Sequence, residues 1–164
     1  MTTVEDKNRF RSAIGNSRKL LGAAAICLIS VTRIHAVPEA TVAIEKPKAR
    51  SATGGNCELF SDGSLKADWG ASSLPMLAIV ITPRSAGEVF DAMRPSKTPY
   101  TGPGKYQNVI VAVHLGKTAL EESYLDLGTV VFNADNRTGS FQLNDGSASG
   151  RFDCGQPLQR RKHD

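Results

Sequence analysis

The 164-residue sequence is poor in the side chains on which most catalytic and metal sites depend. It has three histidines, three cysteines and one tryptophan, and aromatic residues make up 6% of the chain. Between residue 37 and Cys154 the sequence contains one histidine, His114. A soft-ligand metal site needs more histidines or cysteines than this, so we expect no bound metal and no cofactor.

The chain also lacks net charge once its first 36 residues are set aside. The whole sequence carries a net charge of +4, from 20 basic and 16 acidic residues. Six of the basic and two of the acidic residues lie in residues 1–36, which leaves 14 of each in the remainder. Nucleic-acid binding depends on a basic surface, and we therefore expect no nucleic-acid partner.

Residues 1–36 have the pattern of a secretory signal peptide. Basic residues precede an uncharged apolar run over residues 20–31, and Ala36 is a small residue before an expected cleavage at Val37. The run is too short to cross a bilayer, which needs roughly 20 helical residues, so no transmembrane span is expected. The residues at 17–21, Ser-Arg-Lys-Leu-Leu, leave twin-arginine export open beside general secretion. The predicted location is the medium, the periplasm or the cell envelope.

The rest of the chain divides into three parts by composition. Residues 37–55 contain two prolines, small alanines, basic residues and the Gly54-Gly55 pair, which is typical of a flexible tether. Residues 56–155 hold the apolar runs and turn signals of a compact domain. Residues 156–164 are polar and are expected to fray as a tail.

Two cysteines, Cys57 and Cys154, lie near the two ends of this domain. In an oxidising compartment we expect them to form one disulfide between the first and the last strand. Closing a loop of about a hundred residues stabilises a fold by roughly 4–5 kcal/mol on the chain-entropy argument. A redox-active pair is the alternative, but no activating sequence context accompanies either cysteine.

Apolar runs and turn residues inside the domain have the period of strands. Residues 76–82 and 108–115 are β-branched runs without clean alternation, which predicts a sheet covered on both faces. Turn signals predict three hairpins or sharp turns, at residues 61–64, 134–138 and 144–146. Short helices are expected at residues 86–93 and 118–125. The prediction is an all-β fold, an antiparallel β-sandwich or open barrel of about six or seven strands with one disulfide.

Three segments together resemble a bacterial family. They are a Tyr-x-Gly-Pro-Gly-x-Tyr turn at residues 100–106, a Gly-Thr-Val hairpin at residues 128–141 and a closing Gly-x-x-x-Cys at residues 150–154. The pattern resembles that of small secreted proteins and lipoproteins with a β-domain. The lipidated cysteine of the lipoprotein members is missing here, and Thr138 stands where serine is commoner. The resemblance implies export and a β-fold, and it implies no reaction.

No catalytic constellation accompanies these features. His114 lies between Val113 and Leu115 without a nucleophile elbow nearby, which is typical of a structural or surface histidine. We therefore expect a binding or interaction module with an unknown envelope or extracellular partner. An accessory envelope protein without a discrete ligand is the alternative, and a small hydrolase is the third hypothesis.

The loop between Tyr100 and Tyr106 is the candidate binding site. Gly102 and Gly104 flank Pro103 and predict a tight reversal with a tyrosine on each side. Tyrosines are favoured in recognition surfaces because they join a large ring to a polar tip. The alternative is that both rings pack this turn against the sheet, with their hydroxyl groups bonded to the backbone.

Overall fold

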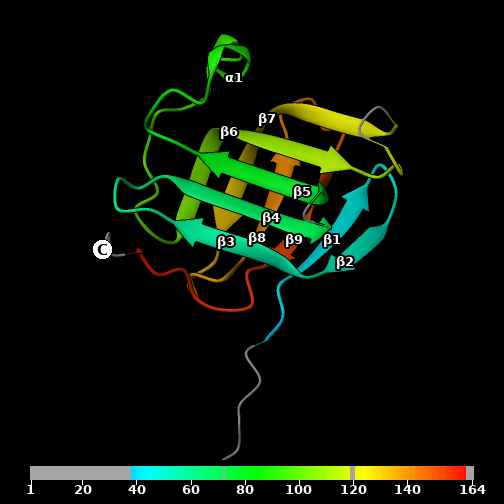
Figure 1. The fold of residues 1–164 in the computed structure, drawn as a ribbon, viewed down its shortest axis with the longest axis horizontal. Helices are drawn as coiled ribbons and strands as arrows, with labels where there is room; N and C mark the ends of the chain where they lie inside the picture. Colours follow the sequence, from blue (N-terminus) through cyan, green and yellow to red (C-terminus); the bar gives the residue numbers. More distant parts are fainter. Residues whose placement is uncertain (1–37, 72, 119–120, 162–164) are drawn as a thin grey trace, which may run out of the picture. The chain divides into compact units, whose positions relative to one another are not determined.

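The computed structural model describes residues 38–71, 73–118 and 121–161, so the predicted signal peptide lies outside the described residues. The described residues form nine strands and one short helix (Figure 1). In chain order these are β1 (Thr41–Lys46), β2 (Arg50–Thr53), β3 (Gly55–Leu59), β4 (Leu65–Ala71), β5 (Leu74–Ile81), α1 (Glu88–Ala92), β6 (Gly104–His114), β7 (Ser123–Phe132), β8 (Thr138–Leu143) and β9 (Ser149–Asp153).

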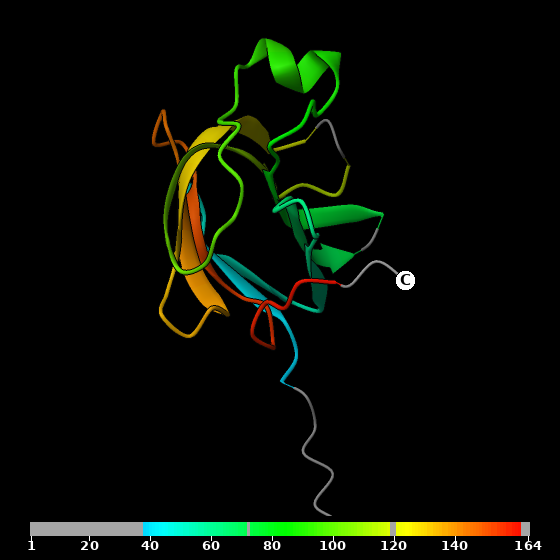
Figure 2. The same cartoon turned by 90° about the vertical axis from the view of Figure 1, so that its left-hand side faces the viewer.

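All nine strands belong to one antiparallel sheet that curls into a nearly closed barrel. The strand order is β2-β1-β9-β8-β7-β6-β5-β4-β3. Figure 2 shows the two walls of the barrel, with β7–β9 on one side and β3–β5 on the other. The predicted all-β, barrel-like fold with one disulfide is confirmed, with more strands than expected. No helix in the described part of the chain is long and apolar enough to cross a membrane.

The additional strands come from the segment predicted to be a flexible tether, and that prediction is wrong for residues 38–55. Residues of β1 alternate between the core and the solvent, and Val42 and Ile44 are buried. β1 pairs with β9, more than a hundred residues later in the sequence, as in the register Val42–Phe152. Sequence composition could not reveal this pairing, because the partner strand is remote.

Gly54 and Gly55 form the corner at which β2 continues into β3. The amide of Gly54 donates to the carbonyl of Ala40, 2.8 Å away, and the carbonyl of Gly54 accepts from the amide of Gly70 at 3.0 Å. Gly54 has a φ of 81°, and a Cβ on Gly55 would lie 2.3 Å from the carbonyl oxygen of Asp68. Glycine is therefore required where the two edges of the sheet meet.

The core fills the barrel with buried side chains from every strand except β2, whose residues are exposed or half-buried. On β4 the inward residues are Leu65, Ala67 and Trp69, and all three are fully buried. β5 alternates between buried and half-buried positions, so the core covers one face of the strand. The prediction of a sheet covered on both faces is therefore wrong for β5. Its outward Val80 lies opposite Ile110 of β6, beside Phe90 of α1 in a shallow groove.

The predicted helices and the predicted C-terminal tail agree with the structure only in part. α1 confirms the helix predicted at residues 86–93, but β7 begins at Ser123, where a second helix was predicted. The prediction of a fraying tail is wrong for residues 156–161, the part of the chain after Gly155 that the structure describes. Leu158 is buried, its amide donates to the carbonyl of Asn136, and the amide of Arg161 donates to the carbonyl of Leu59. These contacts exist because the segment lies along β3, next to the disulfide.

Candidate binding groove

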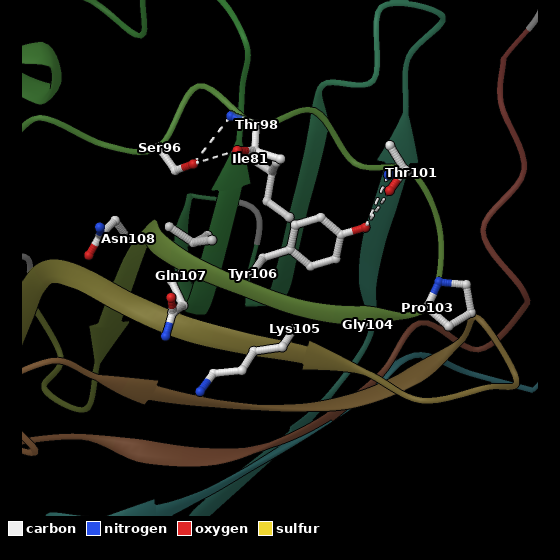
Figure 3. A pocket seen from close by; sticks show the side chains of 11 residues that line it. Ile81, Ser96, Thr98, Thr101, Pro103, Gly104, Lys105, Tyr106, Gln107 and Asn108 are labelled. Atoms are coloured by element: carbon white, nitrogen blue, oxygen red, sulfur yellow. Dashed lines mark hydrogen bonds between the residues drawn. The ribbon is translucent and has the colours of Figure 1, made fainter.

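A groove lies between the first half of β6 and the loop of residues 94–103, which links α1 to β6. It encloses about 440 Å³. Figure 3 shows Ser96, Thr98 and Thr101 on the loop side, with the ring of Tyr106 and the side chain of Ile81 below them. No carboxylate or histidine lines the groove in the described part of the chain.

The groove exists because β5 ends early. The pairing of β5 with β6 stops at Val80–Ile110, and β5 itself ends at Ile81. Pro83 follows two residues later, and proline has no amide hydrogen to donate to a sheet. β6 continues beyond β5, and within the described residues its positions 104–106 and 109 pair with β7 and with no other strand. The groove thus occupies the position where a longer β5 would lie.

Tyr106 holds the far end of the loop in place. Its ring is in the core, with 8% of the residue exposed. Its hydroxyl oxygen accepts from the amides of Thr101 at 3.0 Å and Gly102 at 3.2 Å, and the hydroxyl donates to the carbonyl of Gly102 at 2.7 Å. The loop is therefore fixed before any ligand arrives.

Tyr100 packs beside Tyr106, with ring centroids 5.2 Å apart and the rings stacked. It is 1% exposed, and its hydroxyl bonds the side-chain oxygen of Asn136, whose amide nitrogen donates to the carbonyl of Leu158 at 2.9 Å. Burial raises the pKa of the Tyr100 hydroxyl well above its usual value. Both rings are buried, as the packing alternative expects, but only the Tyr106 hydroxyl bonds the backbone, because that of Tyr100 bonds the side chain of Asn136.

The near end of the loop is attached to a β-bulge in β6. The register with β7 shifts between Tyr106 and Val109, and Asn108 has a φ of 55°. The amide of Ser96 donates to the carbonyl of Asn108, 2.9 Å away. Ser96 and Thr98 also bond to each other through their hydroxyl oxygens at 3.0 Å. A bulge commonly redirects side chains at a sheet edge, and here it joins the edge to the loop.

Charges near the loop differ in whether they are neutralised. Lys97 pairs with Asp91 at 2.7 Å and donates to the carbonyl of Arg84 at 2.8 Å. The hydrogen bond from Lys97, followed by that from Ser85, lowers the pKa of Asp91 to about 2. Lys105 is exposed, and it belongs to none of the ion pairs within the described residues. Lys105 thus leaves one unpaired positive charge beside the groove.

The remaining predicted residues lie elsewhere. Cys57 and Cys154 form the predicted disulfide, with their Cα atoms 5.7 Å apart. His114 lies at the other end of β6, and its Nδ1 is 2.7 Å from the hydroxyl oxygen of Ser123. No cluster of three or more metal-ligating side chains occurs among the described residues.

Of the residues that line the groove, the sequence analysis named Pro103, Gly104 and Tyr106, and the others escaped it because they form no motif. Ser96 and Thr98 are ordinary polar loop residues, and Lys105 and Gln107 alternate with apolar neighbours as in any exposed strand. The one usable signal was Pro83, which marks an early end of one strand beside a longer neighbour.

The chain matches no family model, no curated protein and no solved structure. The functional argument therefore depends on the groove itself and on the fold that holds it.

Proposed function

We propose that this protein is an exported binding module of the cell envelope or the extracellular medium, and that it contacts its partner at the groove beside β6. The observation that carries the proposal is a groove of about 440 Å³ whose loop wall is fixed by the hydroxyl of Tyr106. Preorganised walls lower the ordering cost of binding, which favours recognition.

Two features support export. The Cys57–Cys154 disulfide is a bond that persists in oxidising compartments. The pattern of residues 1–36 is that of a cleavable secretory signal. The protein isolated from its native host should therefore have an intact mass that begins at or near Val37. Retention of residues 1–36 in the exported form would contradict this part of the proposal.

The chemistry of the lining favours binding over catalysis. General acid–base catalysis needs a carboxylate, histidine or similar group within hydrogen-bond reach of the reacting atoms. The groove instead presents hydroxyl groups of Ser96, Thr98 and Thr101 together with amide and backbone groups of β6. Such groups can orient a ligand through hydrogen bonds.

The proposal is tested by capture of partners from an envelope extract of the native host. Thr98→Arg places a long charged side chain on the groove wall, and we expect it to abolish capture of the specific partner. Ser51→Arg makes the same change on exposed β2, far from the groove in the sheet order, and should leave capture intact. Equal capture by wild type and Thr98→Arg, or no specific capture by wild type, would overturn the proposal. The second result would favour an accessory protein without a discrete ligand.

A further inference from the structure

We propose that the partner is an extended, acidic peptide segment that adds as a strand to the open edge of β6. This inference rests on the proposed function of the groove and specifies the class of its partner. Strand addition draws affinity from main-chain hydrogen bonds and specificity from alternate side chains. It requires a sheet edge with unpaired backbone groups and room beside it.

The hydrogen bonds of β7 show which of its residues turn toward β6. The amide of Asn133 donates to the carbonyl of Thr138, and the amide of Asn144 donates to the carbonyl of Leu127. These bonds direct odd-numbered residues at both ends of β7 toward the β8 side. Successive residues of a strand direct their backbone groups to opposite neighbours. The even-numbered residues of β7 therefore turn toward β6.

This alternation orients the backbone of Lys105. Val130 and Phe132 of β7 face Tyr106 and Gly104 of β6 in the register. These pairs exchange the ladder hydrogen bonds, so Lys105 between them directs its amide and carbonyl away from β7. On that side β5 has already ended, and the groove lies in its place. Lys105 thus presents a donor and an acceptor to an incoming strand.

Side chains on the two faces of this edge specify the incoming peptide. Tyr106 points inward, whereas Lys105 points to the other side of the strand (Figure 3). A residue of the added strand opposite Lys105 would lie on this outer face as a cross-strand neighbour. An acidic side chain there would neutralise the unpaired ammonium group, and no carboxylate lines the groove within the described residues to compete with it.

The same charge argues against a second copy of this chain as the occupant. If the β6 edges of two copies paired with each other, the Lys105 side chains of both copies would lie in the same pair of strands and repel each other. Lysine residues and bulges on exposed edges are devices that prevent self-association, and β6 carries both, with its bulge at residues 107–108. An acidic peptide turns the repulsive lysine into an attractive contact.

The test uses the chain isolated from its host with the disulfide formed, and a display library of random dodecapeptides as the probe. We expect selected peptides to carry acidic residues at alternate positions. Lys105→Pro removes the open-side amide while sparing the bonds to β7, and should weaken peptide binding by about tenfold or more. Lys105→Ala keeps the amide and removes the charge, so it should weaken binding less and reduce its dependence on salt.

Amide hydrogen exchange keeps the test decisive if Lys105→Pro folds poorly. In the free wild-type protein, the amide of Lys105 should exchange fast and that of Tyr106 slowly, because the latter bonds within the sheet. Bound peptide should slow exchange at Lys105 and leave Tyr106 unchanged. Unchanged exchange at Lys105, equal peptide binding by folded Lys105→Pro, or no selected peptide would overturn strand addition. None of these three results would affect the capture of an envelope partner or its loss in Thr98→Arg. The proposed function fails only if that capture experiment fails.

Discussion

The indole nitrogen of Trp69 on β4 donates a hydrogen bond to the backbone carbonyl of Asp153 at the end of β9, 2.9 Å away. The two residues are 84 positions apart in the sequence and come from opposite sides of the sheet order. The ring of Trp69 also packs against Phe152, with centroids 5.1 Å apart. Cys154 follows Asp153 and is bonded to Cys57 on β3. This seam joins the two walls of the barrel.

Removing the indole should weaken the seam. Trp69→Phe keeps an aromatic ring but removes the donor and leaves a void in a fully buried position. We expect the free energy of unfolding to fall by about 2–4 kcal/mol, measured by urea denaturation followed by circular dichroism. Tyr124→Phe, a conservative change at a half-buried ring, is the control and should cost markedly less. An equal loss in both variants would contradict the role of the hydrogen bond to Asp153.

The disulfide should contribute a large share of the stability. Cys57→Ser should lower the free energy of unfolding by about 2–5 kcal/mol, because the reduced chain gains conformational freedom when unfolded. A reducing agent should lower the denaturation midpoint of the wild type to a similar extent and leave that of Cys57→Ser unchanged. Indifference of the wild type to the reducing agent, or two free thiols in non-reducing peptide mapping, would contradict this expectation.

The corner between β2 and β3 should tolerate no side chain. Gly55→Ala would place a methyl group 2.3 Å from the carbonyl oxygen of Asp68, so the closing edge of the sheet must move. Gly102→Ala is a matched control, because it has a similar backbone strain at a φ of 139° but nothing within 4 Å of the added group. We expect the control to lose about 1–3 kcal/mol in thermal or urea unfolding and Gly55→Ala to lose more. Equal losses would show that strain alone acts at Gly55.

Acid should destabilise the fold through Asp153. The hydrogen bonds from Arg137, at 2.6 and 2.5 Å, and then that from the amide of Gly155 lower the pKa of Asp153. A lowered pKa in the folded state gives stability that is present above the unfolded pKa, about 3.9, and is lost as the pH falls through the folded value. The urea concentration at the unfolding midpoint should therefore decrease as the pH falls below about 4. The decrease should be less steep in Asp153→Asn. Glu88→Gln, an exposed carboxylate on α1, is the control and should follow the wild type.

The hydroxyl of Tyr106 should hold the groove open. Tyr106→Phe removes the partner of the Thr101 and Gly102 amides, and we expect their hydrogen exchange to become faster and stability to fall by about 1–2 kcal/mol. Partner capture should weaken as the loop wall loosens. Tyr100→Phe is the matched control, because its hydroxyl bonds Asn136 and not the loop amides. Protection of Thr101 and Gly102 that is the same in both variants would contradict this role.

Local patterns were enough to predict most of β3 to β9. Asp62-Gly63 and Asp145-Gly146 mark their turns because their side chains and backbone conformations satisfy nearby amides, as when Asp62 accepts from the amide of Ser64 at 2.8 Å. The runs over residues 76–82 and 108–115 carry β-branched residues that favour strands whatever their neighbours. These determinants lie within a few residues of each other, so the sequence displays them directly.

The sequence by itself determined the all-β character, the hairpins and the pairing of Cys57 with Cys154. The tertiary structure decided the rest. Val42 and Ile44 are held in the sheet by Phe152 and Gly150 of β9 on one side and by β2 on the other, and the glycine corner at residues 54–55 is required only where two sheet edges meet. The groove likewise arises from β5 stopping short of β6, which is a relation between strands. Pairing partners far apart in the chain leave no local pattern, because their free energy is gained only after the barrel has closed.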